Sequence, residues 1–384
     1  MNVILGADAI CYPLTGIGRY AYELAKGLSR SPEVETLRFL QGARLTVVMP
    51  TGEAVDVGRA DAVRSFKLQL LKSRVIVAAY RKLYGFRRGR ALLGEKDALF
   101  HGPNYYLPPH CGPCVSTFHD MSVFRHPEFH PIERVRYMEK ELAAALQRAN
   151  VIVTDSEHAR AELLHYSGFS AQRVLAVPLA VSADFYPRTE AECAAVLQRH
   201  RLVFQGYCLY AGTIEPRKNI ARLLDAFEML PDDLRYRFPL VVVGYRGWKS
   251  EVLHERLVAA EAKGWARYLG FVPDEELSII YAAAKIFAFP SIYEGFGLPV
   301  LEAMASGVPV LCSNASSLPE VAGDCALMCD PEDIDRLVVL LERTILDSAW
   351  RDAVIIDGMK RALNFSWDKT VAGTLAAYRM ALLD

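Results

Sequence analysis

The stretch YEGFGLPVLEAMASGVPVLCS, residues 293–313, decides how this chain folds. Gly295 and Gly297 permit a tight turn, and the Leu-Pro pair that follows starts a helix, because proline is favoured in a first helical turn. The apolar run VPVLCS (308–313) after that helix is typical of a buried strand. A turn, a helix and a buried strand in this order indicate one repeat of a parallel α/β sheet.

Charged residues in the same stretch predict a ligand. Glu294 and Glu302 are separated by seven residues. The helix that starts at Leu298 presents free N–H groups and the positive end of its dipole beside Gly297, which suits a phosphate. Glu302 lies about one turn inside this helix, where its carboxylate can accept hydrogen bonds from ribose hydroxyls. The stretch therefore predicts a nucleotide site, and the alternative is a glycine-rich helix start with two solvated acids.

Alternating strands and helices extend outward from this stretch through the second half of the chain. The expected strands are 207–212, 239–244, 267–272, 285–290 and 308–313. The expected helices lie near 219–230, 249–263, 274–284, 298–306, 331–345, 349–363 and 366–383. This alternation is the pattern of a parallel sheet with helices on both faces.

The first half of the chain shows the same alternation. The expected strands are 3–8, 45–50, 98–102, 115–120 and 151–156, and the expected helices are 17–29, 131–149 and 157–167. The segment 173–189 contains Pro178 and Pro187 and breaks the rhythm, which indicates an interdomain connection. We therefore expect an α/β protein with two Rossmann-like, doubly wound domains, 1–187 and 188–365, that face a central cleft.

Length and composition exclude several classes of protein. The chain has 384 residues, 52% of them apolar and 23% charged, and a net charge of −1. This balance argues against intrinsic disorder and against a nucleic-acid partner. No apolar run reaches the roughly 18 residues of a membrane span, and the start MNVILGADAI lacks the basic region of a secretory signal. We therefore expect a cytoplasmic protein.

The eight cysteines do not indicate a disulfide scaffold in a chain of this length. Cys111 and Cys114 have the spacing of a thioredoxin-type redox motif, but that motif normally follows a strand and opens a helix. Here the pair precedes an expected strand, so we interpret it as a Gly-Pro turn with two incidental thiols. No second cluster of comparable spacing is present to complete a zinc site.

A second charged motif, AGTIEPRKN (211–219), follows an expected strand and precedes an expected helix. It therefore lies at the edge of the sheet where doubly wound folds bind their ligands. Arg217 offers a planar donor fork and Lys218 a compact charge, and together they suit a diphosphate. The alternative is a solvated pair of cations in a turn.

Two motifs of the first half are expected at the corresponding edge. In PLTGIGRYAYEL, Gly16 and Gly18 lead into a helix and could bring backbone N–H groups close to a phosphate or a sugar, although the full GxGxxG fingerprint is absent. In STFHDMS, His119 and Asp120 end a strand, where the imidazole could polarise a hydroxyl or move a proton. A plain glycine turn and a structural histidine are the alternatives.

Together these motifs resemble the retaining glycosyltransferases of the GT-B fold, glycosyltransferase family 4. The E-x7-E pattern of the family matches Glu294 and Glu302, its Arg-Lys pair matches Arg217 and Lys218, and its strand-end histidine matches His119. Its glycine-rich loop matches the glycines of the TGIG sequence. The resemblance runs the length of the chain and is firmest in the second half.

The resemblance implies that a nucleotide-diphosphate sugar binds mainly to the second domain. Arg217 and Lys218 would neutralise the diphosphate while the bond to the anomeric carbon breaks, without a metal ion. Glu294 would lie near the donor sugar, and the base would lie against the backbone near Phe271 and Val272. Retention could follow from same-face attack or from a covalent intermediate.

The resemblance also assigns the remaining positions. Gly297 and Leu298 would complete the phosphate clamp, and Glu302 would bind the ribose. His119 would face the sugar, and Asp120 is a candidate base on the acceptor side.

Among members of the family, the resemblance is to bacterial mannosyl- or rhamnosyltransferases of surface-polysaccharide and O-antigen assembly. It implies GDP-mannose or a GDP-deoxyhexose as the donor, a glycan linked to a polyprenyl lipid as the acceptor, and no separate cofactor. The terminal segment 366–384 would cross back to the first domain as a helix. A UDP-sugar donor, a sugar-nucleotide epimerase or phosphorylase, and a non-catalytic sugar-binding protein are the alternatives.

Residues 67–93 form a separate feature, with eight Lys or Arg residues and no acidic residue. Leu, Ile, Val and aromatic residues are interleaved with these cations, which favours a surface that rests on anionic lipid. We therefore expect peripheral contact with the cytoplasmic face of a membrane. The alternative is an ordinary pair of helices with a solvated cationic face.

Overall fold

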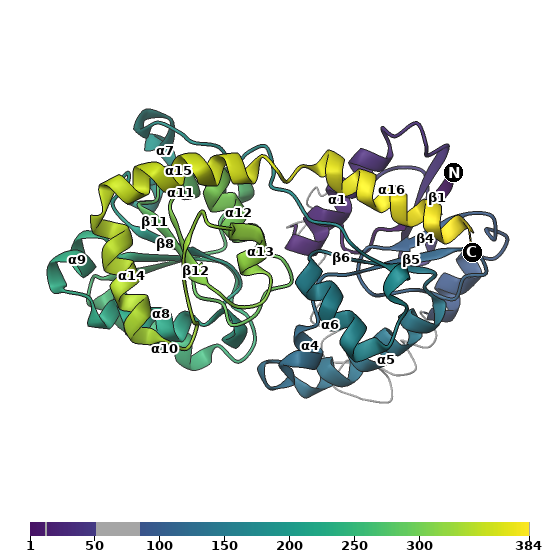
Figure 1. Ribbon diagram of the computed structural model, residues 1–384, viewed down its shortest axis with the longest axis horizontal. Coiled ribbons are helices and arrows are strands. Elements are labelled where there is room, and N and C mark those ends of the chain that lie inside the picture. Colours follow the sequence, from purple (N-terminus) through teal and green to yellow (C-terminus); the bar gives the residue numbers. More distant parts are fainter. Residues whose placement is uncertain (12–13, 51–84, 384) are drawn as a thin grey trace.

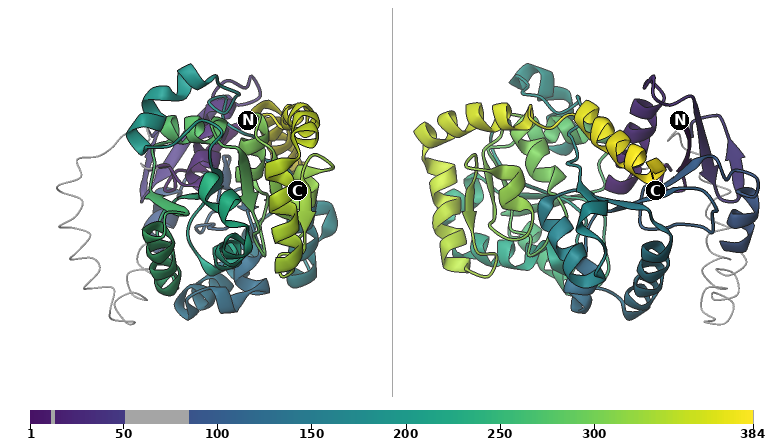
Figure 2. Two further views of the ribbon diagram at one scale, coloured as in Figure 1. Left: turned by 90° about the vertical axis from the view of Figure 1, so that its left-hand side faces the viewer. Right: turned by 45° about the vertical axis from the view of Figure 1, so that its right-hand side comes forward.

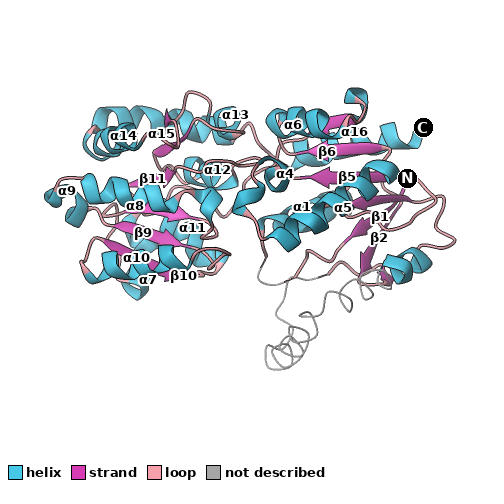
Figure 3. Ribbon diagram, turned by 90° about the horizontal axis from the view of Figure 1, so that it is seen from below, coloured by secondary structure: helices cyan, strands magenta, loops and turns pink. Residues whose placement is uncertain are grey.

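The computed structural model of the chain describes residues 1–11, 14–50 and 85–383. The chain forms two lobes that lie side by side (Figure 1). In each lobe a sheet is covered by helices on both faces, because strands buried on both faces must be shielded from water on both (Figure 3).

The described part of the N-terminal lobe contains one sheet of mainly parallel strands. These strands are β1 (Asn2–Gly6), β2 (Thr36–Gln41), β3 (Arg44–Thr46), β4 (Leu99–Gly102), β5 (Cys114–Phe118), β6 (Val151–Thr154) and β7 (Val174–Ala176). Their order is β3-β2-β1-β4-β5-β6-β7, and β3 alone among them is antiparallel. The helices are α1 (Gly16–Leu28), α4 (Ser122–Arg125), α5 (Ile132–Arg148) and α6 (Glu157–Ser167), with short 3₁₀ turns at Pro127–Phe129 and Ala171–Arg173.

The C-terminal lobe repeats this plan with a fully parallel sheet. Its strands are β8 (Cys208–Ala211), β9 (Leu240–Val243), β10 (Ala266–Gly270), β11 (Ile286–Phe289), β12 (Val310–Ser313) and β13 (Leu327–Cys329), in the order β10-β9-β8-β11-β12-β13. Its helices are α7 (Glu190–His200), α8 (Ile220–Met229), α9 (Asp232–Arg237), α10 (Glu251–Ala262), α11 (Asp274–Ala282), α12 (Leu298–Ala305), α13 (Leu318–Ala322), α14 (Ile334–Leu346) and α15 (Ser348–Ala362).

Both sheets reverse their strand order beside their first strand. The reversal lies between β1 and β4 in one sheet and between β8 and β11 in the other. Two Rossmann-like, doubly wound domains are therefore confirmed. Ligands of such sheets bind outside the carboxyl ends of the strands at the reversal, so these four loops are where a site is expected.

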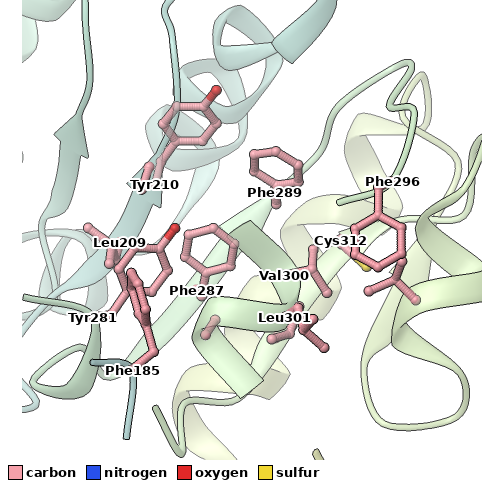
Figure 4. Packing of buried hydrophobic residues seen from close by; sticks show 14 of the residues in the cluster. Phe185, Leu209, Tyr210, Tyr281, Phe287, Phe289, Phe296, Val300, Leu301 and Cys312 are labelled. Carbon is pink, nitrogen blue, oxygen red and sulfur yellow. The ribbon is translucent and has the colours of Figure 1, made fainter. Parts of the chain in front are cut away.

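A column of aromatic rings forms part of the core of the C-terminal lobe (Figure 4). The ring centroids of Phe185 and Tyr281 are 5.3 Å apart, those of Tyr281 and Phe287 are 5.2 Å apart, and those of Phe287 and Phe289 are 5.7 Å apart. Tyr210 of β8 stacks on Phe289 at 5.8 Å. The column joins the two strands at the reversal and fixes their carboxyl ends relative to each other.

The strand expected over 45–50 is wrong. The chain instead forms β2, turns at Gly42 and returns along the short edge strand β3. Val47 and Val48 beyond β3 are 74% and 71% exposed, so this apolar run does not belong to the core. Phe39 and Leu40 of β2 are buried in the core, so β2 is the inner strand of this pair. The local sequence pattern does not reveal which of two neighbouring apolar runs is buried.

Two further strands are absent from the sequence prediction. The segment 173–189, expected to be a connection, begins with β7, which pairs with β6. The edge strand β13 pairs with β12 in a segment where the sequence predicts no strand. Each of these strands has three residues. So short a segment shows no clear alternation of apolar and polar residues, and it becomes a strand because it pairs with its neighbour in the sheet.

The terminal helix α16 (Trp367–Leu383) leaves the C-terminal lobe and packs on α1 and on the sheet of the N-terminal lobe (Figures 1 and 2). Its Tyr378 hydroxyl lies 2.7 Å from Nδ1 of the buried His101, and Nε2 of His101 lies 2.8 Å from the Thr117 hydroxyl. Burial lowers the pKa of His101 to about 3, so this ring is a neutral link between α16 and the sheet.

The CGPC pair and the cationic segment lie in the N-terminal lobe. Cys114 begins β5 as a buried free thiol whose pKa burial raises to about 12, which fits the interpretation as a turn before a strand. Most of the segment 67–93 lies outside the described residues; in its described part, Arg88 lies 3.0 Å from the Asp8 carboxylate. No helix within 1–11, 14–50 and 85–383 is long and apolar enough to cross a membrane.

Candidate active site

The two charged motifs of the C-terminal lobe meet at the reversal of its sheet. Arg217 and Lys218 lie in a short 3₁₀ helix between β8 and α8, and Glu294 lies in the loop after β11. Glu294 accepts from Arg217 Nη1 at 3.0 Å through one oxygen and from Lys218 Nζ at 2.6 Å through the other. The structure therefore brings together three of the predicted residues in one ion cluster.

Backbone contacts hold the two loops of this cluster together. The Ile292 N–H donates to the Arg217 carbonyl at 2.9 Å, and Arg217 Nη1 also donates to the Tyr293 carbonyl at 2.7 Å. Asn219 closes the 3₁₀ turn in the left-handed region, with a φ of 59°, and its side-chain amide donates to the Pro290 carbonyl at 3.0 Å. These contacts join segments more than 70 residues apart in the sequence, so the sequence does not predict them. They hold the backbone that positions Arg217 and Lys218.

The cluster is buried and internally balanced. Glu294 and Lys218 are 6% and 8% exposed, and Arg217 also pairs with the buried Glu215 at 2.8 Å. Burial opposes a charged Glu294, but Lys218 and Arg217 lower the pKa of this carboxyl overall. Burial lowers the pKa of Lys218, and Glu294 counteracts it. The two cations are thus fixed in place by two acids, and an incoming anion would compete with those acids for them.

Asp120 belongs to the same region although it lies in the other lobe. Its carboxylate accepts from the Ser122 N–H at 2.9 Å. Burial would raise the pKa of Asp120, but the nearby Arg217 and the contacts to Ser122 lower it. An ionised acid from the N-terminal lobe therefore lies within electrostatic reach of the cationic pair.

His119 is turned into its own lobe. Its Nδ1 lies 2.7 Å from Asp155 and its Nε2 lies 2.8 Å from the Pro103 carbonyl oxygen. Burial alone would lower the pKa of His119, but Asp155 raises it overall. The His119 backbone carbonyl lies at the lobe boundary, against Gly295, so this residue is next to the site, and its role toward the sugar stays a prediction.

Gly295 is required at this boundary by close packing. A Cβ at position 295 would lie 1.8 Å from the His119 carbonyl oxygen and 2.8 Å from Asp120 Cβ. Across the same contact, the Ser156 hydroxyl donates to the Gly295 carbonyl at 2.7 Å, and the Met121 N–H donates to the Tyr293 hydroxyl at 3.1 Å.

The predicted glycine-rich turn opens α1 at the carboxyl edge of the N-terminal sheet. Thr15 is the N-cap residue, and its hydroxyl accepts from the Gly18 N–H at 3.2 Å. The Gly18 N–H is therefore already engaged in the protein, whereas a Cβ on Gly16, at the start of the helix, would meet no atom of the described residues within 4 Å. Arg19, the residue after Gly18, reaches the other lobe and pairs with Asp274 at 2.6 Å.

The helix start predicted in the E-x7-E stretch is present. Gly297, with a φ of 120°, precedes α12, which begins at Leu298 and has no side-chain cap. Glu302 lies one turn inside α12 and is half-buried. Burial raises its pKa, while Arg19 from the opposite lobe counteracts the shift. The predicted phosphate and ribose residues thus lie beside the boundary between the lobes.

The predicted base-binding residues lie one strand away. Phe271 follows β10, is 40% exposed, and stacks on Tyr245 with ring centroids 4.7 Å apart, whereas the Val272 side chain is buried in the core. Tyr245, which follows β9, is not among the residues that the sequence predicts. The pair presents an aromatic surface at the carboxyl edge of the C-terminal sheet.

Sequence reasoning missed the residues that join the lobes beside this site. Trp248 of the C-terminal lobe donates from its indole to the Phe129 carbonyl at 2.7 Å, and the ring of His130 packs 5.6 Å from it. His130 is 3% exposed, and neither ring nitrogen has a hydrogen-bond partner among the described residues. Burial, with Arg134 nearby, lowers the pKa of His130 to about 4. No sequence motif marks these residues, because they come together only where the two lobes are in contact.

Two facing Rossmann-like domains, with a cationic pair and an uncapped helix start at the reversal of the second sheet, are the arrangement of the GT-B fold, and they offer a site that suits an anionic ligand. Comparison with known proteins agrees. Residues 14–185 match Glycosyltransferase Family 4, and residues 204–361 match Glycosyl transferases group 1. The chain therefore belongs to the family of GT-B glycosyltransferases that these two domain descriptions define, and it is a glycosyltransferase.

Similar proteins cover the whole chain. It is 45% identical to O-antigen chain mannosyltransferase B of Escherichia coli over 99% of this chain and 100% of that protein. It is 31% identical to MMP alpha-(1->4)-mannosyltransferase of Mycolicibacterium hassiacum over 64% of this chain and 57% of that protein. The crystal structure of WaaG, a glycosyltransferase involved in lipopolysaccharide biosynthesis, shares the fold with a TM-score of 0.70 at 17% identity, over 98% of this chain and 99% of that one.

Proposed function

We propose that this glycosyltransferase moves mannose from GDP-mannose to a growing surface-polysaccharide glycan, with retention of configuration at the anomeric carbon. The observation that carries the proposal is the 45% identity, along the whole chain, to a protein named as an O-antigen chain mannosyltransferase. In this proposal the acceptor is linked to a polyprenyl lipid, and the enzyme works at the cytoplasmic face of a membrane.

The ion cluster supports a mechanism for the transfer. Phosphate oxygens of the donor would compete with Glu294 for Arg217 and Lys218 and would leave Glu294 beside the sugar. Negative charge develops on the diphosphate as its bond to the anomeric carbon breaks, and cations already fixed in a buried site stabilise that charge without reorganisation. Asp120, ionised and close to the cations, is the candidate that takes the proton of the acceptor hydroxyl.

Nucleotide binding tests the donor. Binding to the folded state adds RT ln(1 + [L]/Kd) of stability, so the Tm of the protein should rise with GDP and GDP-mannose, and the rise should persist in EDTA. A rise with UDP and UDP-sugars instead would replace the donor and keep the family. No rise with any nucleotide would contradict the donor site proposed at the ion cluster and α12.

Two variants locate the nucleotide. Glu302→Ala should shrink the rise in Tm with GDP, because the ribose loses its acceptor. Glu261→Ala removes an exposed acid at the far end of α10 and should leave the rise unchanged. An equal rise in both variants would mean that the ribose binds elsewhere.

The configuration of the product, read from the anomeric proton signals, tests retention.

A further inference from the structure

A cavity lined by residues of the N-terminal lobe lies apart from the residues of the ion cluster. Its volume is about 490 Å³, which is within the range of roughly 300–1,000 Å³ for small-ligand sites. Ile17 of α1, the segment 104–106 after β4 and the segment 131–138 at the start of α5 line it. Three segments that are far apart in the sequence therefore line one cavity that is open to solvent.

Tyrosine rings form one side of this cavity. The ring centroids of Tyr105 and Tyr106 are 4.7 Å apart, and those of Tyr106 and Tyr137 are 5.7 Å apart with an interplanar angle of 36°. A pyranose presents an apolar face of C–H groups and a rim of hydroxyls. Flat aromatic rings suit the face, and a few placed polar groups suit the rim.

A polar atom without a partner is also present in the lining. Asn104 Oδ1 is buried and has no hydrogen-bond partner among the described residues. Buried polar atoms are normally paired, so an orphaned acceptor in a cavity lining indicates a donor that arrives with a ligand. A sugar hydroxyl is such a donor.

The charge of the lining favours a neutral ligand. It carries one acid, Glu133, and one cation, Arg134, whose guanidinium lies 4.7 Å above the ring of Trp248 from the other lobe. These charges cancel, so the cavity does not offer the excess of cations that a diphosphate needs.

The cavity adjoins the expected transfer point. Ile17 lies between Gly16 and Gly18 of the glycine-rich turn. Pro103, next to Asn104, accepts from His119 Nε2 at 2.8 Å. The cavity is therefore on the acceptor side of the cleft.

We propose that this cavity binds one pyranose of the acceptor glycan, with Tyr106 and Tyr137 against its C–H face and Asn104 Oδ1 accepting from one of its hydroxyls. The assignment rests on the proposed function, because it takes the acceptor to be a glycan. It gives the glycan a fixed register, since a sugar held here places the next one toward Asp120 and the donor.

Binding and kinetics with a defined probe test the assignment. Tyr137→Ala and Asn104→Leu should each raise the KM for α-mannotriose by about tenfold, the effect of one lost aromatic contact and of one lost hydrogen bond, respectively. The KM for the donor and the rise in Tm with GDP should stay unchanged, because neither residue belongs to the ion cluster or to the start of α12, where the donor is assigned. Tyr137→Phe keeps the ring and should stay near the parent value. Tyr166→Ala removes an exposed ring on α6 and is the matched control.

A donor-free readout separates this assignment from the proposed function. Saturation-transfer NMR should detect α-mannotriose on the parent protein and lose the signal in Tyr137→Ala, whichever nucleotide sugar is the donor. Unchanged signal and unchanged acceptor KM in folded Tyr137→Ala and Asn104→Leu proteins would overturn the assignment. Failure of GDP-mannose as a donor would overturn the proposed function alone.

Discussion

At the scale of single residues, the ion cluster of Arg217, Lys218 and Glu294 is the part of the site best suited to catalysis. Glu294 occupies both Arg217 and Lys218, so the cations are oriented before any donor arrives. Lys218 Nζ also lies 5.1 Å above the ring of Phe289, one of the rings of the aromatic column. A lysine fixed in this way has little freedom to lose when the transition state forms.

Lys218→Ala should therefore lower kcat by about 10²–10³-fold, because one preorganised charge is removed from the leaving diphosphate. The KM for the donor should change less, since Arg217 remains. Steady-state kinetics at saturating donor check this, with Lys285→Ala, a partly buried lysine before β11, as the control. Turnover within twofold of the parent would show that the diphosphate leaves elsewhere.

His119 predicts how stability depends on pH. Both of its partners, the Asp155 carboxylate and the Pro103 carbonyl, accept hydrogen bonds, so the ring donates from both nitrogens and is protonated. Despite burial, Asp155 raises the pKa of His119 above the ordinary 6.5. The folded state keeps a proton that the unfolded state releases, so its stability is full below that value and falls as pH rises through the folded pKa.

Urea unfolding from about pH 6 to about pH 9 measures this slope. His119→Gln should be less stable than the parent at the acid end, and this difference should shrink as pH rises, because glutamine does not titrate whereas His101 and His130 titrate alike in both proteins. Parallel profiles would assign the slope to another group.

At the scale of elements, α16 is the connection that returns the chain to its first lobe. The link from Tyr378 through His101 to Thr117 is buried, and Thr117 also lies 2.9 Å from the Tyr20 hydroxyl of α1. One hydrogen-bonded chain therefore joins α16, the sheet and α1. The helix follows the sequence pattern, but its place depends on this link.

Tyr378→Phe removes one hydroxyl from this chain and leaves a nitrogen of buried His101 without its partner. The free energy of unfolding of the N-terminal lobe should fall by about 1–3 kcal/mol. Calorimetry measures the loss, and Tyr236→Phe, at a 49% exposed ring on α9, is the control. Equal stability of the two variants would show that the link is dispensable.

At the scale of the whole molecule, contacts between the lobes assemble the site. Glu320 of α13 accepts from the first N–H groups of α6, at 3.0 Å from Glu157 and 3.2 Å from His158, and so caps a helix of the other lobe. Arg19 pairs with Asp274 across the same boundary. Asp120 lies within electrostatic reach of Arg217 only because the lobes are in this arrangement.

Gly295→Ala should prevent this approach, because its methyl group would overlap the His119 carbonyl. Each lobe should still fold and GDP should still raise the Tm, but turnover should fall by about 10²-fold, since small displacements of reacting groups are that costly. Comparing the Tm rise with turnover separates the two effects. Gly85→Ala is the control, because no atom of the described part of the chain lies within 4 Å of a Cβ there, and parent-like turnover of Gly295→Ala would contradict the close approach.

The sequence by itself determined the features that depend on near neighbours along the chain. Apolar runs separated by helical periods specify a parallel α/β sheet, because each strand must be buried on both faces. The glycines and Pro299 specify where α12 begins, and the motifs at strand ends specify which loops carry charge. Strands as short as β7 and β13 could not be predicted in this way, because they depend on pairing with β6 and β12 in the folded sheet.

Only the tertiary structure decided how those local features meet. The ion cluster joins residues 217, 218 and 294 because β8 and β11 lie side by side in the sheet although they are far apart in the sequence. The inward turn of His119, the cap that Glu320 places on α6 and the tyrosine-lined cavity likewise need two or three distant segments. Such contacts depend on packing and on burial of charge, which act across space, whereas a sequence motif reports only on its own turn or helix.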